Sequence, residues 1–405
     1  MSAGPTGRRR TQRSVIFYPR SFIMNKTVLS AAIAIGSLVL ASSAGAEELS
    51  QFISAGKATA DLRLRYENND TDNNLKTADA LTLRSRLGLQ SGRVNGFSAL
   101  VEIDDIRALV DNYSPESPGY NLVADPEDTE FNRVQISWNN DKFSAVLGRQ
   151  RILLDNTRFV GNVGWRQNEQ TFDAVKFGYK TPVYQAQYAY INQVNDITFN
   201  DIDVSHHLIN VNYSGFKPGS LTGYAYLLED DATDTSNDTY GVRFSGKQAV
   251  NDLSVLYSAE YALQKTDNFD ASYLALEGGV LVQGVTLALG YESLGSDDGA
   301  YGFQTPLATK HAFNGWADKF LNTPNDGLTD TYVKVATAVA GVNLLAFYHD
   351  YSSEQGSDDK GNEVNVQAGK NFGKYYSAGV KYAAYRKGDN GTDTDKAWLW
   401  LEAKF

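Results

Sequence analysis

The sequence of 405 residues lacks cysteine altogether and contains only nine prolines and four histidines. The absence of cysteine excludes disulfides and thiolate metal sites. The histidines are too scattered along the chain to indicate a metal cluster. We therefore expect no metal ion and no other cofactor. The chain also lacks a long apolar run after residue 46, whereas a membrane-spanning helix needs about 20 consecutive apolar residues.

The one marked apolar run is short and lies near the N-terminus, at residues 28–40. It follows the basic start Met24-Asn25-Lys26 and precedes the small residues Ala44-Gly45-Ala46, which together are typical of a secretory signal peptide. We predict a signal peptide over 24–46. Residues 1–23 are then a non-native upstream extension, and a twin-arginine signal is the alternative.

Positive charge is scarce beyond the signal peptide. The formal net charge is −11, and residues 1–46 carry six Lys or Arg and no acid, so their removal takes the charge to −17. A generic nucleic-acid-binding protein needs a basic face. The composition therefore predicts no nucleic-acid partner.

Aromatic residues are abundant, with 24 Tyr, 19 Phe and 5 Trp. In the segment DLRLRYE at residues 61–67, apolar and charged residues alternate, which directs them to opposite faces of a strand. Transmembrane β-barrels combine such alternation with a high aromatic content, because lipid-facing and lumen-facing residues average out. A soluble β-sandwich also alternates, so the number and order of strands must decide.

The same periodicity predicts eighteen strands. They run roughly over 57–68, 78–91, 96–107, 130–139, 142–152, 169–180, 183–192, 205–214, 221–229, 238–247, 252–265, 270–281, 284–294, 329–340, 341–351, 362–371, 375–386 and 395–405. An even number suits a bacterial single-chain barrel. Longer, often acidic connectors follow the odd strands and short turns follow the even ones, as at the extracellular and periplasmic rims of such barrels.

We therefore predict an all-β fold over 47–405, a transmembrane antiparallel up-and-down β-barrel of about 18 strands in the bacterial outer membrane. Its outer face would contact lipid and lipopolysaccharide. The first strand must pair with the last, because an unpaired strand edge in lipid costs several kcal/mol per polar group. Eighteen strands leave a water-filled lumen. The last strand ends on Phe405, the kind of terminal residue by which barrel assembly machinery recognises its clients.

Arginine is concentrated in one sector: eleven of the thirteen arginines after residue 46 lie between Arg63 and Arg166. Fixed charges in a lumen bind carboxylates or orient polar solutes. The predicted pore-lining or solute-binding residues are Arg63, Arg65, Arg84, Arg86, Glu102, Asp104, Arg133, Arg149, Arg151, Arg158, Arg166 and Asp173. The alternative is that these ions pair with one another and stiffen the barrel.

The connector at 295–329 is unusually long for a chain without strands of its own, and such loops are usually functional. We predict that it folds over or into the barrel mouth beside the loop 152–168, with aromatic faces on which sugar rings stack. The predicted gating residues are His311, Phe313, Trp316, Asp318, Lys319 and Phe320. An ordinary exposed cap is the alternative.

Three runs resemble signature stretches of the alginate export family: GRQR at 148–151, FVGNVGWRQNEQTFD at 159–173 and PLATKHAFNGWADKF at 306–320. The resemblance implies an eighteen-stranded outer-membrane channel for an anionic polysaccharide, with a pore lined by arginine and lysine and gated by loops. Glu102, Asp104 and Glu260 are also expected on the inner face. A different oligosaccharide or a small anion, moved in either direction, is therefore left open.

The sequence thus predicts a porin for a hydrophilic, anionic solute such as an oligosaccharide or uronate polymer, and not an enzyme. A general diffusion porin is the first alternative. An outer-membrane hydrolase needs a nucleophile beside a histidine, and only Ser205 with His207, and His349 with Ser352 and Ser353, are such neighbours. A surface receptor or adhesin is the third class, although no domain-sized insertion is evident.

Overall fold

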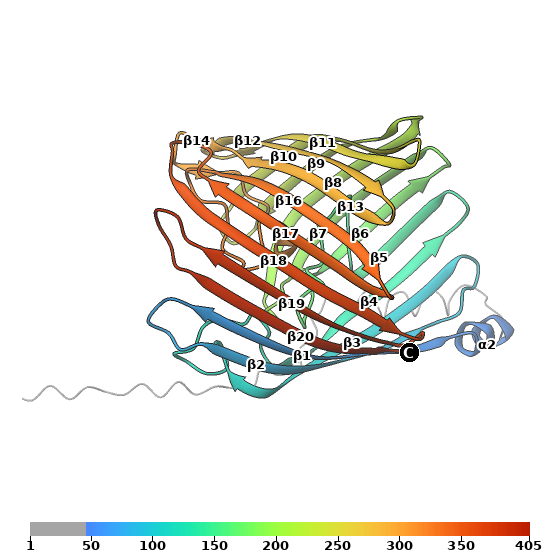
Figure 1. The fold of residues 1–405 in the computed structure, drawn as a ribbon. Helices are drawn as coiled ribbons and strands as arrows, with labels where there is room; N and C mark the ends of the chain where they lie inside the picture. Colours follow the sequence, from blue (N-terminus) through green and yellow to red (C-terminus); the bar gives the residue numbers. More distant parts are fainter. Residues whose placement is uncertain (1–45) are drawn as a thin grey trace, which may run out of the picture.

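Residues 46–405 are described by the structure, a computed structural model, so the upstream extension over 1–23 and all but the last residue of the expected signal peptide lie outside the described residues. Eighteen strands form one sheet that closes into a barrel (Figure 1). They are β1 (Lys57–Thr71), β2 (Ala78–Gln90), β3 (Phe97–Asn112), β4 (Asp128–Asn139), β5 (Phe143–Gln150), β6 (Thr171–Lys180), β7 (Tyr184–Asn195), β8 (Asp201–Phe216), β9 (Gly219–Asp230), β10 (Thr235–Val250), β11 (Leu253–Thr266), β12 (Asp270–Val282), β13 (Val285–Leu294), β16 (Leu328–Val339), β17 (Val342–Ser352), β18 (Asp359–Phe372), β19 (Tyr376–Arg386) and β20 (Thr394–Lys404).

Closure occurs between the first and last strands. β1 pairs antiparallel with β2 on one side and with β20 on the other, in a register that runs from Asp61↔Lys404 to Thr71↔Thr394. Every other neighbouring pair around the cylinder joins wall strands that are consecutive in sequence, and all pairs are antiparallel. The predicted fold, strand number and closure are therefore confirmed, and no strand edge is left unpaired in the wall.

The faces of the wall are inverted relative to a soluble protein. On β2, Leu87 and Leu89 are 58% and 67% exposed, whereas Arg84 and Arg86 on the opposite face are only 3% and 7% exposed. Lipid replaces water on the outside of such a barrel, so apolar side chains belong there and charged ones belong inside. Among residues 46–405, no helix is long and apolar enough to cross a membrane.

Several strands are longer than the periodicity predicted. β3 continues to Asn112, and β8 extends from Asp201 to Phe216, so the connector expected at 193–204 shrinks to 196–200. The extensions lie at hairpin ends and mix polar and apolar residues. A transmembrane barrel has an apolar band only about 25 Å tall, and beyond it both strand faces meet water, so backbone pairing continues while the alternation disappears.

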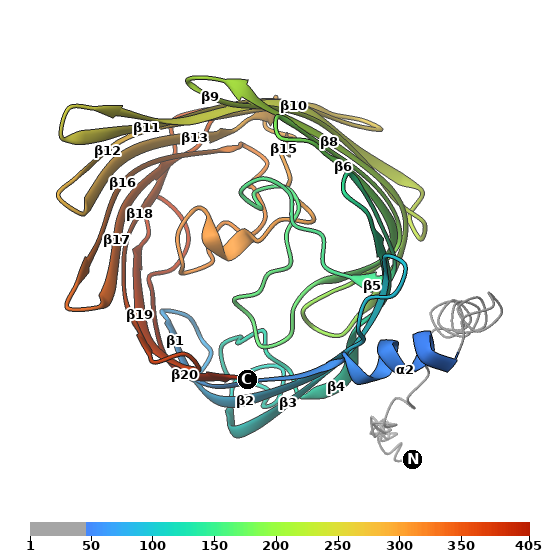
Figure 2. The ribbon, with the colours of Figure 1, turned by 90° about the vertical axis from the view of Figure 1, so that its right-hand side faces the viewer.

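The two rims differ. At one rim the connectors are turns of two or three residues, apart from residues 91–96 between β2 and β3. In the turns Gln283-Gly284 and Ala340-Gly341 both residues have positive φ (48° and 80°; 52° and 75°). Glycine tolerates this conformation, which tight hairpin turns require. The opposite rim carries the long connectors. Its two longest, loop 151–170 and loop 295–327, run inside the barrel (Figure 2).

Short elements complete the chain. Helix α2 (Ala46–Ser54) precedes β1 and lies outside the barrel beside the short-turn rim (Figure 2), and the alternation did not predict it. Loop 295–327 contains the paired strands β14 (Ser296–Asp297) and β15 (Tyr301–Gly302) and the 3-10 helix η1 (Lys310–Ala312). The buried apolar core lies between the infolded loops and the wall, where Phe159 and Phe303 pack against Tyr273 of β12.

Candidate functional site

Loops 151–170 and 295–327 are joined to each other inside the barrel. The amide of Gly161 donates to the carbonyl of Leu307 at 2.9 Å, and the amide of Thr309 donates to the carbonyl of Thr157 at 3.0 Å. Gly161 permits this approach, because a Cβ there would lie 2.1 Å from Oγ1 of Thr309. The two loops therefore form one body, which we call the loop plug.

Arginines of β1 hold loop 151–170 to the wall. Nε of Arg63 donates to Oε1 of Gln167 at 2.8 Å, and Arg63 also donates to the carbonyl of Arg166. Arg65 donates to the carbonyl of Trp165 and pairs with Asp125. These guanidinium groups thus bind the chain's own loop in the lumen.

A second group of ions centres on Glu169 of the same loop. Arg86 lies 3.0 Å from its carboxylate, Nε of Arg151 donates to it at 2.7 Å, and Asn132 donates to it at 2.7 Å. Burial acts to raise the pKa of Glu169, but the charges of Arg86 and Arg151 outweigh it and lower the pKa to about 2. Glu169 is therefore ionised across the physiological range and stays bound to the wall.

The remaining predicted pore-lining residues also form pairs. The partners are Arg84 with Asp61 at 2.8 Å, Arg86 with Asp104 at 2.6 Å, Arg133 with Glu102 at 2.6 Å, Arg149 with Asp173 at 2.8 Å and Arg158 with Glu292 at 2.7 Å. Most of these side chains are buried. A buried charge needs a partner, so much of the arginine-rich sector is neutralised. The first four pairs join neighbouring strands of the wall, and only Arg158 with Glu292 of β13 attaches the plug.

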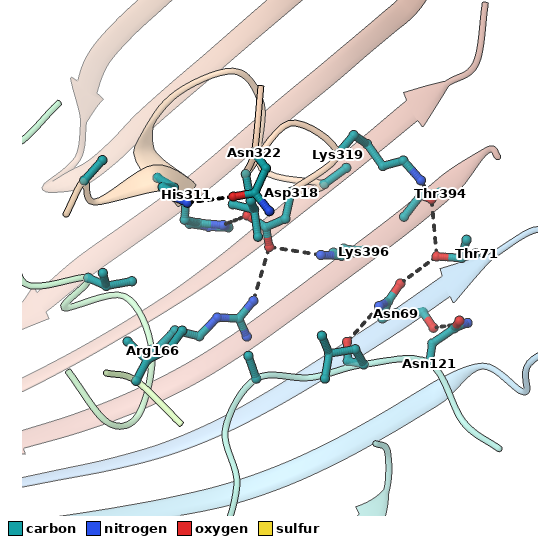
Figure 3. Close-up of a pocket in the computed structure, with 18 of the residues that line it drawn as sticks. Asn69, Thr71, Asn121, Arg166, His311, Asp318, Lys319, Asn322, Thr394 and Lys396 are labelled. Atoms are coloured by element: carbon teal, nitrogen blue, oxygen red, sulfur yellow. Dashed lines mark hydrogen bonds and ion pairs between the residues drawn. The ribbon is translucent and has the colours of Figure 1, made fainter. Parts of the chain in front are cut away.

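A cavity of about 640 Å³ lies between the plug and the wall toward the long-loop rim. We call it the vestibule. Its charged lining residues are Arg166, Lys310, Lys319, Lys396, Asp196 and Asp318. The cations outnumber the carboxylates four to two, although the whole chain has a net charge of −11. Asparagine side chains, including Asn69 and Asn121, add hydrogen-bonding groups (Figure 3).

Asp318 lies at the centre of the vestibule's charges (Figure 3). Its Oδ2 accepts from Nη2 of Arg166 at 3.2 Å and from Nζ of Lys396 at 3.0 Å. Its Oδ1 lies 2.6 Å from Nδ1 of His311. Burial acts to raise the pKa of Asp318, but its contacts with His311, Lys396 and Arg166 outweigh burial and hold the pKa well below its ordinary value.

His311 is a neutral hydrogen-bond bridge. Burial lowers its pKa to about 3, and the charge of Asp318 only partly opposes this. Its Nε2 lies 2.8 Å from Nζ of Lys381, which can only donate, so Nδ1 carries the hydrogen and donates to Asp318. His311 therefore connects the carboxylate of the plug to a cation on the wall strand β19.

Lys381 is enclosed by aromatic rings. Its Nζ lies 3.8 Å from the ring centroid of Trp316 and 4.2 Å from that of Trp165, which stacks on His311 at 4.9 Å. Trp316 is only 5% exposed. The expectation that Trp316 offers an open face to a sugar ring is therefore wrong, because a lysine of the wall occupies that face.

The other predicted gating residues take different positions. Phe313 is half-buried and lies under the guanidinium of Arg158, 4.9 Å from ring centroid to charge. Phe320 packs against Tyr351, and Nζ of Lys319 donates to Oγ1 of Thr392 and Thr394 at 3.1 and 3.2 Å. Aromatic side chains here fix the loop rather than cover an open surface.

A second cavity of about 270 Å³ lies on the other side of the plug. Residues 312–316 line this second cavity, whereas Lys310, His311 and residues 317–319 line the vestibule. The segment 310–319, which we call the partition, therefore separates the two cavities. One face of the partition borders the vestibule and the other borders the second cavity, and different residues form each face.

Sequence reasoning identified Arg166, His311, Asp318 and Lys319 of the vestibule but missed Lys310 and Lys396. Lys396 had a usable signal, because it alternates with the outward stripe of β20 formed by Leu399 and Leu401. No pattern in the sequence indicated the vestibule residues Asn69 and Asn121, since their positions depend on loop packing.

The histidines proposed for a hydrolase have other partners. Nδ1 of His349 lies 2.9 Å from Oδ1 of Asp330, and Nδ1 of His207 lies 2.9 Å from the hydroxyl of Tyr188. Within residues 46–405, neither histidine is hydrogen-bonded to the serine beside it in sequence. In the same range no three or more His, Asp or Glu side chains group as metal ligands.

Comparisons with known proteins agree with this architecture. The model of the alginate export family matches residues 56–303, more than half of the chain. No curated protein matches the chain in sequence.

Several solved structures resemble it in fold. OccAB4 of Acinetobacter baumannii superposes with a TM-score of 0.70 at 15% identity, over 86% of this chain and 98% of that one. OccK1 (OpdK) of Pseudomonas aeruginosa gives 0.69 at 16% identity, over 87% and 99%. OpdK with vanillate gives 0.68 at 16% identity, over 87% and 99%.

Proposed function

The chain belongs to the alginate export family and forms a porin-like β-barrel channel of the bacterial outer membrane, and from this premise we propose that it passes a hydrophilic, anionic solute through a lumen gated by loops. The observation that carries the proposal is the charge of the vestibule. Four cations face a cavity of about 640 Å³ against two carboxylates, one of which, Asp318, is already bound by Arg166 and Lys396.

Two of these cations are available to a solute. Lys310 donates to Oδ1 of Asn322 at 2.9 Å, and Lys319 donates to threonine hydroxyls. Neither forms an ion pair with a carboxylate of the described residues. Lysine ammonium groups bind carboxylates as point charges, so Lys310 and Lys319 provide the first contacts for an anion that enters from the long-loop rim.

The solute class that fits is a small carboxylate. Ligand sites of about 300 to 1,000 Å³ hold single small molecules, and the vestibule lies within that range. One of the similar barrels was solved with vanillate, an aromatic carboxylate. A uronate monosaccharide or short uronate oligosaccharide combines the same charge with hydroxyls that the exposed lining residues Asn73 and Asn322 can bind.

The partition is the proposed gate. It lies between the vestibule and the second cavity, and it belongs to the plug rather than to the wall. The predicted pore-lining residues then divide into two groups. Arg166 contacts the solute, and Arg63, Arg65, Arg86, Arg151 and Arg158 hold the plug. The wall pairs formed by Arg84, Arg133 and Arg149, with Glu102, Asp104 and Asp173, shape the lumen field.

Phe405 is the proposed contact with barrel assembly machinery. Its amide donates to the carbonyl of Ala60 at 2.8 Å, so its backbone continues the pairing of β20 with β1. Its side chain is 55% exposed and stacks on Tyr375 at 5.4 Å. An exposed aromatic residue at the short-turn rim is reachable by a partner while the barrel closes.

Liposome swelling with the purified full chain tests the function. We expect vesicles that contain the protein to swell faster in isosmotic sodium D-glucuronate than in an uncharged sugar of the same size such as D-glucose. The double variant Lys310→Gln/Lys319→Gln should lose this preference. Equal swelling in the two solutes would instead favour a general diffusion porin.

A further inference from the structure

We infer that Asp318 is an internal competitor for the channel's carboxylate site: it occupies the place of a solute carboxylate on Arg166 and Lys396, and a solute opens the gate by replacing it. The inference rests on the proposed function and identifies the event that opens the partition. It concerns the contact in Figure 3 where a carboxylate of loop 295–327 meets cations from two other parts of the chain.

Arg166 is held in place independently of Asp318, and Lys396 is fixed at its backbone. Arg166 uses Nη1 to bind Glu67 of β1 at 3.0 Å and directs Nη2 to Asp318 at 3.2 Å. Lys396 extends from the wall strand β20. When Asp318 leaves, Nη2 of Arg166 therefore keeps its position, and Nζ of Lys396 remains within reach of the same point because its backbone is fixed in the wall. A guanidinium and an ammonium around one point form a carboxylate site.

Departure of Asp318 without a replacement is costly. Arg166 and Lys396 are both only 6% exposed, and Lys396 has no ion-pair partner other than Asp318 within residues 46–405. A buried cation that loses its only partner is strongly destabilised. A solute carboxylate removes this cost, because it restores the same pair of contacts and leaves the charge of the site unchanged.

This difference couples binding to opening. In the closed state Asp318 fills the site, so a carboxylate binds there weakly, whereas in the open state the site is vacant. A ligand shifts a conformational equilibrium only by its difference in affinity between the two states. An uncharged sugar lacks that difference and leaves the gate closed.

Release of Asp318 affects the outer half of the partition. Asp318 holds His311 through Oδ1, and both residues face the vestibule. The inner half is held elsewhere, since the amide of Trp316 donates to Asn365 of β18. The amide of Ala317, the first vestibule-facing residue after it, donates to Glu363 of the same strand. His311 and Asp318 can therefore move and uncover Ala317, while residues 316–317 stay attached to the wall.

The absence of cysteine from the chain allows a direct test. Ala317 lines the vestibule and is 2% exposed, so the thiol of an Ala317→Cys variant reports access to the partition through its rate of labelling by a small uncharged maleimide. We expect sodium D-glucuronate to increase this rate about tenfold, a usual size for coupling between sites. D-glucose should leave it unchanged.

Asp318→Asn in the Ala317→Cys background should give fast labelling without glucuronate and no further response to it. The matched control is Asp326→Asn, which removes a carboxylate of the same loop that pairs with Lys360 outside the vestibule. This control should retain slow, glucuronate-sensitive labelling. Folding of each variant is checked by the shift in gel mobility between unheated and heated samples.

Labelling of Ala317→Cys that ignores glucuronate overturns the inference, whether or not the Asp318→Asn variant folds. If Asp318→Asn does not fold, Lys396→Gln takes its place, with faster basal labelling and a reduced glucuronate response expected. Preferential swelling in glucuronate with an unresponsive thiol refutes only the role of Asp318. Absence of swelling by the parent protein refutes the proposed function itself.

Discussion

The ammonium group of Lys381 lies 3.8 Å from the ring centroid of Trp316, so strand β19 of the barrel wall contacts loop 295–327 directly. Trp165 of the other infolded loop contacts the same ammonium at 4.2 Å. One wall residue thus holds both loops of the plug. A desolvated cation–π contact contributes about 2 kcal/mol, so this is a strong point of attachment.

Lys381→Met should loosen the plug, because methionine retains the apolar stem but loses both cation–π contacts and the hydrogen bond to His311. We expect more frequent current fluctuations in single-channel recordings and easier proteolytic nicking of loop 295–327. Lys374→Met is the matched control, since Lys374 lies over the exposed Tyr375 at the short-turn rim, 5.1 Å from its centroid. Quiet recordings from Lys381→Met that match this control would contradict the anchoring role.

Acid should release loop 151–170 through Glu169. Its pKa is lowered from 4.5 to about 2 in the folded protein, so the unfolded chain binds the proton more readily. The stabilisation is fully present above about pH 4.5 and is lost as the pH falls toward 2. Thermal unfolding followed at several pH values should show this loss, and Glu169→Gln should remove that part of the pH dependence. An identical pH profile for the variant would exclude Glu169 as its source.

Gly161→Ala should separate the two infolded loops. The added Cβ would lie 2.1 Å from Oγ1 of Thr309 and 2.9 Å from Cβ of Thr157, so the loops must move apart. Overpacking of this kind costs about 1–3 kcal/mol, and we expect faster proteolysis of the plug in the folded barrel. Gly278→Ala serves as the control, because no atom lies within 4 Å of its added Cβ. Equal proteolysis of the two variants would show that the loops do not depend on this approach.

The wall could be predicted from the sequence because alternation acts residue by residue. Arg63 and Arg65 alternate with Leu62 and Leu64. Because the leucines face lipid, the arginines must face the lumen, and this holds whatever the exact residue at which the strand begins. The residues at which the strands end could not be predicted in this way, since both faces of a strand meet water there and the alternation is lost.

The plug could be predicted only in outline. Its length and composition indicated a functional loop, but its contacts join residues far apart in the chain, such as Arg158 with Glu292 and Arg166 with Asp318. Local patterns carry no information about which acid meets which arginine. For the same reason the burial of Trp316 against Lys381 could not be predicted, because β19 and the loop meet only after the barrel closes.

Ion selectivity tests the central claim most directly, that the vestibule cations set what passes. The reversal potential of the purified full chain in a planar bilayer, across a potassium chloride gradient, should show preference for chloride over potassium. Two unit charges about 4 Å apart in water interact by about 1 kcal/mol, equivalent to roughly fivefold per lysine, so Lys310→Gln/Lys319→Gln should reduce the preference severalfold. A preference for potassium in the parent protein, or a preference for chloride that both substitutions leave intact, would contradict the account.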